Sequence, residues 1–259
     1  MGLPEGSVVW VTGAGSGIGR ACAIAFAKAG ARIALTGRRL SPLEQTASIV
    51  RELCGRSALV VQADVTDPAA VAAALRTIVQ TLDDPLVLVN SAGGNVTQRH
   101  WRNVSPESAS KVIDQDLKAI FYCTLAVLPA MRSRGDGRIV HIGSQAGVSF
   151  QPVTGPSYSA SKHGVVAMSA SLNAEEGIHG IRSICISPGE VETPILDTRP
   201  FPPSAAERRL MLQPDDVAET ALFCVSLPQR ACATQVILLP TDDRLVRGSA
   251  RAIEAMSAD

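Results

Sequence analysis

The first thirty residues contain the pattern that most restricts the fold of this chain. Residues 8–12 form a short apolar run rich in valine, and a glycine-rich turn, Thr-Gly-Ala-Gly-Ser-Gly-Ile-Gly, follows at 12–19. Residues 18–29 then read as a helix of small and apolar residues, with Gly30 as a stop signal. A strand, a tight glycine turn and a helix in this order place a helix N-terminus where a pyrophosphate binds. The sequence therefore predicts a phosphate-binding turn near its start.

Apolar runs that suit strands alternate with helical patterns along the rest of the chain. The predicted strands cover residues 8–12, 32–36, 58–62, 86–90, 138–143, 181–187 and 235–239. The predicted helices cover residues 18–29, 41–54, 68–82, 107–132, 157–177 and 214–227. Such alternation implies a parallel sheet covered on both faces. We therefore predict a single α/β domain over 1–259, of Rossmann type, whose doubly wound parallel sheet has about seven strands flanked by helices.

Composition narrows the class of partner. The formal net charge is +0, which gives no reason to expect nucleic acid or an anionic membrane as a partner. No signal peptide and no apolar run of membrane-spanning length is visible, so we expect a cytoplasmic protein. The six cysteines form no C-x-x-C pair and suit buried, reduced thiols. The four histidines lack the spacing of metal ligands, so no metal site is predicted.

A second pattern lies in the C-terminal half. Tyr158 and Lys162 stand four residues apart on a predicted helix, so their side chains share one face, and Ser144 lies fourteen residues before the tyrosine. A cation near a phenol favours its ionised form and lowers its pKa. Such a phenol suits proton transfer to or from a carbonyl oxygen, which a serine hydroxyl holds in place. Taken alone, the Tyr-x-x-x-Lys spacing is also typical of a surface pair.

Together these patterns resemble the short-chain dehydrogenase/reductase family. The glycine turn fits the spacing T-G-x-x-x-G-x-G rather than the common G-x-G-x-x-G fingerprint. Further family-like segments follow in order: Asp64-Val65 after the third strand, Asn90-Ser91-Ala92-Gly93 after the fourth, and Pro188-Gly189-Glu190-Val191-Glu192-Thr193 after the sixth. The family's usual D-G-G near the end is absent, and Leu239 to Asp243 stand in its place. The resemblance covers nearly the whole chain.

The resemblance implies a nicotinamide cofactor and a set of residues that bind it. In this sequence they are Gly13, Ser16, Gly17, Ile18, Gly19, Arg38, Arg39, Asp64, Val65, Asn90, Ala92, Gly93, Tyr158, Lys162, Pro188, Gly189, Val191 and Thr193. The second strand ends in Gly37, where family members that prefer NAD carry an acidic residue, and Arg38 and Arg39 come next. Guanidinium groups suit a 2′-phosphate, so we expect NADP, with NAD as the alternative.

The resemblance also implies catalytic roles. Tyr158 would pass the proton, Lys162 would lower the pKa of the tyrosine and hold the nicotinamide ribose, and Ser144 would orient the substrate oxygen. The family's fourth catalytic residue is an asparagine, and Asp116 stands at that position here. An aspartate accepts the same hydrogen bonds but has no amide proton to donate. This substitution is the largest departure from the family pattern.

The implied activity is hydride transfer between NADP(H) and a carbonyl or secondary alcohol substrate. The alternative is a dinucleotide-binding sensor or scaffold that has lost catalysis, which is supported only by Asp116. An epimerase or dehydratase is disfavoured because the C-terminal part is short.

Residues 191–211, rich in proline, are expected to cover the substrate as a lid, with an irregular surface loop as the alternative. Residues 95–101, with Gln145, Phe150 and Gln151, are expected near the substrate. The resemblance also implies a homotetramer, because the family usually forms tetramers through helix 157–177 and the helix after the lid, and small residues on one face of helix 157–177 allow close packing.

Overall fold

The structure is a computed structural model, and it describes residues 2–243. Residues 1 and 244–259 belong to the predicted single domain but lie outside the described residues. Seven strands form one sheet in the order β3-β2-β1-β4-β5-β6-β7, and every neighbouring pair is parallel. The strands are β1 (Val8–Thr12), β2 (Arg32–Gly37), β3 (Leu59–Gln62), β4 (Val87–Asn90), β5 (Gly137–Ile142), β6 (Ile181–Pro188) and β7 (Gln235–Leu238). The predicted doubly wound, seven-stranded α/β fold is confirmed.

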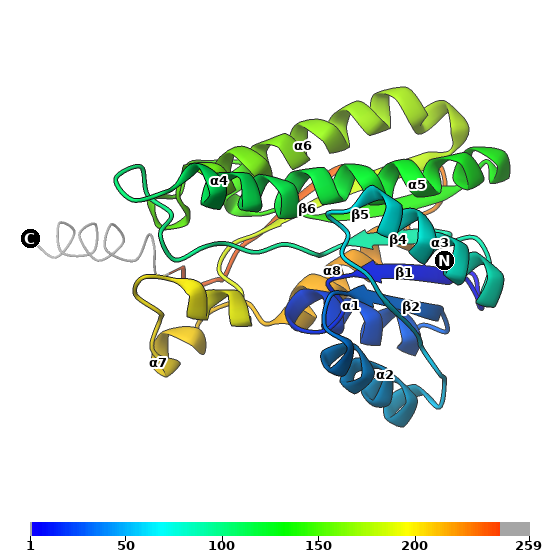
Figure 1. The fold of residues 1–259 in the computed structure, drawn as a ribbon. Coiled ribbons are helices and arrows are strands. Elements are labelled where there is room, and N and C mark those ends of the chain that lie inside the picture. Colours follow the sequence, from blue (N-terminus) through cyan, green and yellow to red (C-terminus); the bar gives the residue numbers. More distant parts are fainter. Residues whose placement is uncertain (1, 244–259) are drawn as a thin grey trace, which may run out of the picture.

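Helices cover both faces of this sheet (Figure 1). One layer holds α1 (Gly17–Lys28), α2 (Leu40–Cys54) and α8 (Pro214–Val225). The opposite layer holds α3 (Pro68–Thr81), α4 (Pro106–Ile113), α5 (Ala119–Arg134) and α6 (Pro156–Glu176). The strand order reverses between β1 and β4, because the chain leaves edge strand β3 and returns beside β1. In open parallel sheets, ligands bind at the carboxyl ends of the strands at such a reversal.

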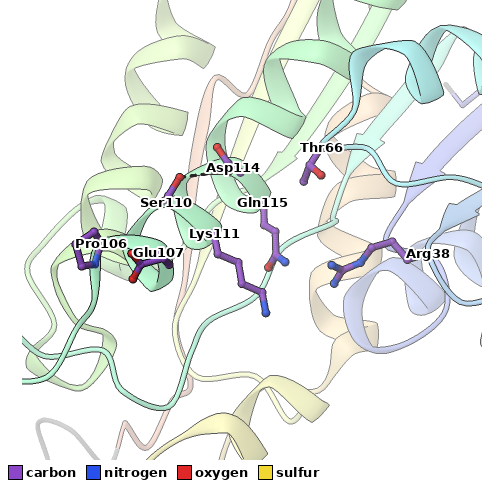
Figure 2. Close-up of a pocket in the computed structure, with 8 residues that line it drawn as sticks. All are labelled: Arg38, Thr66, Pro106, Glu107, Ser110, Lys111, Asp114 and Gln115. Carbon is purple, nitrogen blue, oxygen red and sulfur yellow. Dashed lines mark hydrogen bonds between the residues drawn. The ribbon is translucent and has the colours of Figure 1, made fainter.

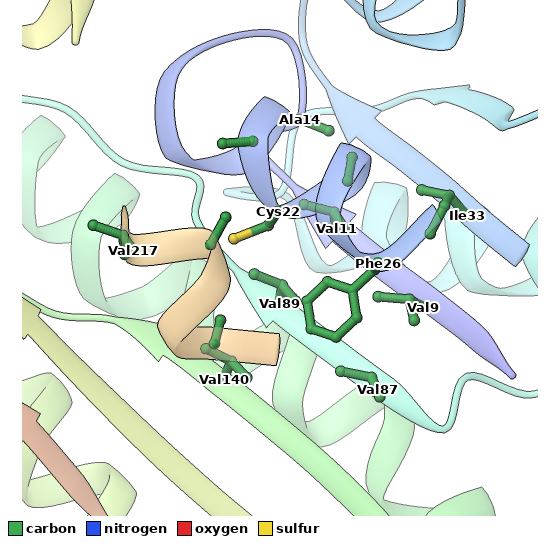
Figure 3. Close-up of a cluster of buried hydrophobic side chains, with 14 of the residues drawn as sticks. Val9, Val11, Ala14, Cys22, Phe26, Ile33, Val87, Val89, Val140 and Val217 are labelled. Carbon is green, nitrogen blue, oxygen red and sulfur yellow. The ribbon is translucent and has the colours of Figure 1, made fainter. Parts of the chain in front are cut away.

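The core explains why the strands read as continuous apolar runs. Every residue of β1 and β4 is buried, as expected for strands covered on both faces. Val9 and Val11 point to one face, where Phe26 of α1 is fully buried among the valines of β1 and β4 (Figure 3). Trp10 points to the opposite face, and its indole Nε1 donates a hydrogen bond to Thr36 Oγ1 at 2.8 Å. The sheet thus has an apolar core on each side.

The segment predicted as one helix over residues 107–132 is interrupted. Between α4 and α5 the chain forms one wide π-helical turn, η1 (Asp114–Lys118). A π turn shifts the residues it contains relative to a regular helix, and such turns are frequent at functional sites. Here the turn contains Asp116, whose side chain is 1% exposed. The interruption therefore places a buried carboxylate at the inner side of the helix.

The segment predicted as a lid has little regular structure. Val191 forms an isolated parallel bridge with Leu212, so both ends of residues 191–211 lie side by side. Between them are a short 3₁₀ helix, η5 (Pro194–Thr198), and one turn of helix, α7 (Ala205–Arg208), capped by Ser204. No helix among residues 2–243 has the length and apolar character needed to cross a membrane. Residues 191–211, in yellow, lie beside the carboxyl ends of the strands (Figure 1).

Candidate active site

The glycine turn after β1 is shaped by close contacts that a side chain would block. Gly13 has φ +65°, and a Cβ there would lie 2.7 Å from the backbone nitrogen of Ala92. A Cβ on Gly19 would lie 2.4 Å from the carbonyl oxygen of Gly13. The first turn of α1 contains no acidic residue, and the side chain of Ser16 makes no capping hydrogen bond. The helix N-terminus is therefore suited to an anion such as a pyrophosphate.

The segment after β4 forms the next wall. The backbone N–H groups of Ser91 and Ala92 donate to Thr12 Oγ1, at 3.1 and 3.2 Å, which ties the end of β4 to the end of β1. A Cβ on Gly93 would lie 2.5 Å from Asp116 Oδ1, so a larger residue there would displace the Asp116 carboxylate. Asn90 is buried below this wall, and its Nδ2 is 3.3 Å from Thr124 Oγ1.

These walls enclose a cavity of about 510 Å³ at the carboxyl ends of the strands. The predicted site residues that line it are Gly13, Ser16, Gly17, Ile18, Arg38, Arg39, Asp64, Val65, Ala92, Gly93, Asp116, Ser144, Tyr158, Lys162, Pro188, Gly189, Val191 and Thr193. Gly19 and Asn90 do not line it. They support it from behind, Gly19 by the close packing of α1 on the turn and Asn90 by its buried hydrogen bonds. Positions far apart in the sequence thus meet in one cavity.

Helix α6 carries Tyr158 and Lys162 into this cavity on one face. Lys162 Nζ lies 5.5 Å from the centre of the tyrosine ring, and it donates a hydrogen bond to the carbonyl oxygen of Ile142 at 2.9 Å. Ser144 follows β5, and its hydroxyl oxygen accepts from the backbone N–H of Ala146 at 3.1 Å. The lysine is thus held in place between the sheet and the phenol.

Asp116 points into the site. Its Oδ1 lies 3.3 Å from Lys162 Nζ, and the backbone N–H of Gly94 donates to both carboxylate oxygens, at 3.2 and 3.3 Å. Burial raises the pKa of the Asp116 carboxyl, while Lys162 and Gly94 act in the opposite direction. Burial lowers the pKa of Lys162, but Asp116 and Tyr158 together outweigh it and raise that pKa. The pair therefore keeps the lysine protonated.

The pKa of the Tyr158 phenol is raised rather than lowered. Burial is the largest cause; Lys162, Ser144 and Arg199 lower this pKa, and Asp116 raises it. The sequence predicts that Lys162 lowers this pKa and that an ionised Asp116 beside the lysine partly offsets the effect, but the burial of the phenol is not visible in the spacing of the motif. The phenol is therefore protonated at neutral pH.

Several residues around the phenol differ from those expected. Gln145, Phe150 and Gln151 were expected near the substrate, but none of them lines the cavity, and Phe150 is 67% exposed. Gln145 lies just behind the lining, since its Oε1 would be 3.6 Å from a Cβ on Gly189. Arg99 and Arg199 line the cavity instead. Arg99 lies in the 95–101 stretch that was expected to approach the substrate, whereas no motif marks Arg199.

A shallow groove extends the cavity at the end nearest Arg38. It lies between the end of β2 and helix α4, and it is lined by Arg38, Thr66, Pro106, Glu107, Ser110, Lys111, Asp114 and Gln115 (Figure 2). The side chains of Lys111 and Gln115 lie across the groove from Arg38 (Figure 2). Asp64 is nearby, but its Oδ1 already accepts hydrogen bonds from the backbone N–H and the hydroxyl of Thr66, at 3.0 and 2.8 Å. Two cations thus face each other at this end.

Comparison with known proteins now identifies the family. The sequence profile described as short chain dehydrogenase matches residues 7–200. The chain belongs to the short-chain dehydrogenase family. Its resemblance to this family, inferred from the motifs, is confirmed, and the protein is an oxidoreductase of that family.

Two relatives illustrate the range of the family. Glycine betaine reductase ATRR of Emericella nidulans (strain FGSC A4) is 32% identical over 249 residues, which cover 92% of this chain but 19% of the relative. The chain therefore spans about a fifth of the length of that relative. An uncharacterised oxidoreductase of Staphylococcus aureus (strain N315) is 32% identical over 230 residues, which cover 89% of this chain and 95% of the relative.

Solved structures agree with this assignment. An actinorhodin polyketide ketoreductase variant with NADPH has a TM-score of 0.82 and 31% identity, and the match covers 92% of this chain and 97% of that one. A 3-ketoacyl-(acyl-carrier-protein) reductase from Brucella melitensis complexed with NADH has a TM-score of 0.82 and 28% identity, over 91% of this chain and 96% of that one.

Among residues 2–243 no group of three or more histidine, cysteine or acidic side chains is arranged to hold a metal ion.

A buried histidine, His141, is expected to make the folded protein less stable at acid pH. His141 of β5 is fully buried, its Nδ1 lies 3.2 Å from Asn90 Nδ2, and its Nε2 has no hydrogen-bond partner in the described structure. Burial, assisted by Lys162, lowers the pKa of His141 from 6.5 to about 3. The unfolded chain therefore takes up a proton below about pH 6.5 that the folded chain does not. The contribution of His141 to stability falls as the pH drops from about 6.5 to about 3.

We expect His141→Asn to reduce this pH dependence. Between pH 7 and pH 5 the histidine should account for a loss of about 2 kcal/mol in the free energy of unfolding, measured by urea denaturation. His179→Asn is the matched control, because His179 is exposed. A slope of stability against pH that is the same in wild type and His141→Asn would contradict the assignment.

Proposed function

We propose that this protein transfers a hydride between NADP(H) and a carbonyl or secondary alcohol substrate, with Tyr158 as the general acid–base. The observation that carries the proposal is that one cavity is lined by both the glycine turn of α1 and the group Ser144, Tyr158 and Lys162. The α1 N-terminus carries no side-chain cap and no acidic residue in its first turn, so its backbone N–H groups suit a pyrophosphate. These features fit a dinucleotide.

The residues of the chain then have distinct tasks. The bound nicotinamide supplies or accepts the hydride, and the protein positions the substrate against it. Ser144 holds the substrate oxygen, Tyr158 passes the proton, and protonated Lys162 holds the nicotinamide ribose. Because the pKa of Tyr158 is raised, the phenol at neutral pH is a proton donor. That state suits reduction of a carbonyl, whereas oxidation of an alcohol needs the ionised phenol and therefore a higher pH.

The first test removes the proton of the phenol. Tyr158→Phe keeps the ring, so binding of the cofactor should be retained. We expect kcat to fall by at least about 100-fold, the scale of general acid–base catalysis. Steady-state kinetics with NADPH and a panel of ketones measure the loss. Near-normal turnover by Tyr158→Phe would contradict the mechanism, and wild type that binds NADPH but reduces no ketone would favour the sensor or scaffold that Asp116 alone supports.

The second test concerns the choice between NADP and NAD. Arg38 and Arg39 follow β2 at the cavity mouth, and Lys111 lies across the groove from Arg38 (Figure 2). These cations favour a 2′-phosphate. We expect tighter binding of NADPH than NADH in wild type, and a loss of about 10-fold or more for NADPH in Arg38→Ala. Arg76→Ala is the control, because Arg76 lies on α3 and is exposed. Equal or tighter binding of NADH than NADPH by wild type would contradict the NADP preference.

The third test concerns Asp116. Its carboxylate raises the pKa of Tyr158, so Asp116→Asn should lower that pKa. Alcohol oxidation gains activity as the phenol ionises, and its pH profile should therefore move to lower pH in the variant, with activity retained. The profile of initial rate against pH measures this shift. An unchanged profile would remove Asp116 from the catalytic group.

We also propose a cytoplasmic homotetramer that is assembled partly through α5 and α6. Of the small residues on α6, Ala160, Ala167 and Ser171 are exposed, whereas Gly164 packs against Leu117 within the chain. On neighbouring α5, Phe121 and Leu125 are 42% and 60% exposed and lie one turn apart. An exposed apolar stripe beside small side chains suits close contact between copies. Light scattering at micromolar concentration should give four times the chain mass, and a monomer would reject this assembly.

A further inference from the structure

Arg99 is a buried arginine beside the catalytic tyrosine. It lies in the loop after β4, is 4% exposed, and lines the cavity together with Tyr158. Its Nε donates to the carbonyl oxygen of Val96 at 2.6 Å, and its Nη2 donates to the carbonyl oxygen and the hydroxyl of Thr198, at 2.6 and 3.1 Å. Thr198 belongs to η5, in the 191–211 segment. The guanidinium is thus fixed between two loops.

The other cations at this end of the cavity have acidic partners. Lys162 pairs with Asp116, and the guanidinium of Arg199 pairs with the carboxylate of Glu190. Arg99 forms no ion pair with any acidic side chain among residues 2–243. The pKa of Arg99 is lowered from 12.5 to about 10, mainly by burial and also by Arg199, while Tyr158 acts in the opposite direction. One positive charge is therefore left uncompensated beside the phenol.

Such a charge is costly unless a ligand supplies its counter-ion. A guanidinium that is removed from water loses hydration that neutral acceptors replace only in part. The acceptors of Arg99, two carbonyl oxygens and one hydroxyl, are all neutral. Its remaining amino group, Nη1, makes no hydrogen bond with any described residue, yet the protein does not enclose it. Nη1 therefore has unused donors, and Arg99 is one of the residues that line the cavity.

We infer that Arg99 binds an anionic group of the substrate, so that the substrate class is ketones that carry a carboxylate or a phosphate, and the corresponding secondary alcohols. The inference rests on the proposed function, because it places the carbonyl of the same molecule at Ser144 and Tyr158. Arginine suits both anions, since its planar N–H donors match their oxygens. Nη1 offers two donors, and the bonds to Val96 and Thr198 keep the group from turning away.

The competing interpretation is that Arg99 only fastens the 191–211 segment through Thr198. The two interpretations differ in what charge on the substrate does. If Arg99 has only this structural role, its substitution should reduce kcat/KM for charged and neutral substrates alike. If Arg99 binds an anion, its substitution should reduce kcat/KM for the charged substrates selectively. Pairs of substrates that share the ketone and its carbon skeleton, one anionic and one neutral, therefore separate the two interpretations.

The experiment compares kcat/KM for reduction with NADPH within such pairs. Pyruvate, acetoacetate and levulinate are each measured beside the methyl ester, and dihydroxyacetone phosphate beside dihydroxyacetone. In wild type we expect at least one anionic ketone to exceed its neutral partner by about 10-fold or more, the scale of a hydrogen bond to a charged group. Arg99→Gln should abolish this preference, change neutral ketones by less than about 3-fold and leave the KM for NADPH unchanged, while Arg99→Lys should restore part of it. The acids and the phosphate identify which anion is preferred.

Arg208→Gln is the matched control, because Arg208 pairs with Asp197 in the same segment and does not line the cavity. It should keep the preference of wild type. No preference for any anionic ketone in wild type, or an equal loss for charged and neutral partners in Arg99→Gln, would overturn the inference.

A binding measurement tests the role of Arg99 independently of the proposed function. If wild type reduces none of the ketones, the proposed function fails. Calorimetric titration of levulinate and its methyl ester into the protein with NADP then tests Arg99 alone. Tighter binding of the acid that is lost in Arg99→Gln supports anion binding, and equal binding of both overturns it.

Discussion

A parallel sheet that is covered on both faces forces every connection to cross back over it, and this constraint organises the whole molecule. All carboxyl ends of the strands therefore meet at one edge, and the side chains that follow them converge. The glycine turn after β1, the segment after β4, Ser144 after β5 and the Pro188–Thr193 segment at the end of β6 meet there for this reason. At this edge the backbone N–H groups of Ser91 and Ala92 donate to Thr12 Oγ1, and these hydrogen bonds join the ends of β1 and β4.

The sequence predicted the sheet well because its signals are local. The inner strands are buried on both faces and are therefore continuous apolar runs, and the edge strands β3 and β7 still carry apolar residues; all seven strands lie within a few residues of their predicted places. The glycine spacing likewise has a local cause, since Gly13 needs a positive φ and a close approach to Ala92. Prolines at helix starts, such as Pro68 and Pro214, are local signals too.

Features that depend on packing between distant segments were not predictable in the same way. No residue pattern announces the π turn of η1, because its wide geometry is visible only in how Asp116 meets Gly93 and Lys162. Arg99 fell inside an expected stretch, but its burial depends on contact with Thr198, ninety-nine residues further along the chain. Phe150, which was expected in the substrate region, is 67% exposed and does not line the cavity.

The charges around Tyr158 show why a sequence motif can identify a catalytic side chain but cannot predict its protonation state. The Tyr-x-x-x-Lys spacing supplies a cation that lowers the pKa of the phenol, and the fold adds burial and Asp116, which raise it. Burial of Lys162 would weaken that cation, yet Asp116 stabilises it. The same carboxylate therefore secures the lysine and makes the phenol less acidic. A substitution of asparagine by aspartate changes two groups at once, and the balance at neutral pH favours a protonated phenol, which is the form that delivers a proton to a carbonyl oxygen.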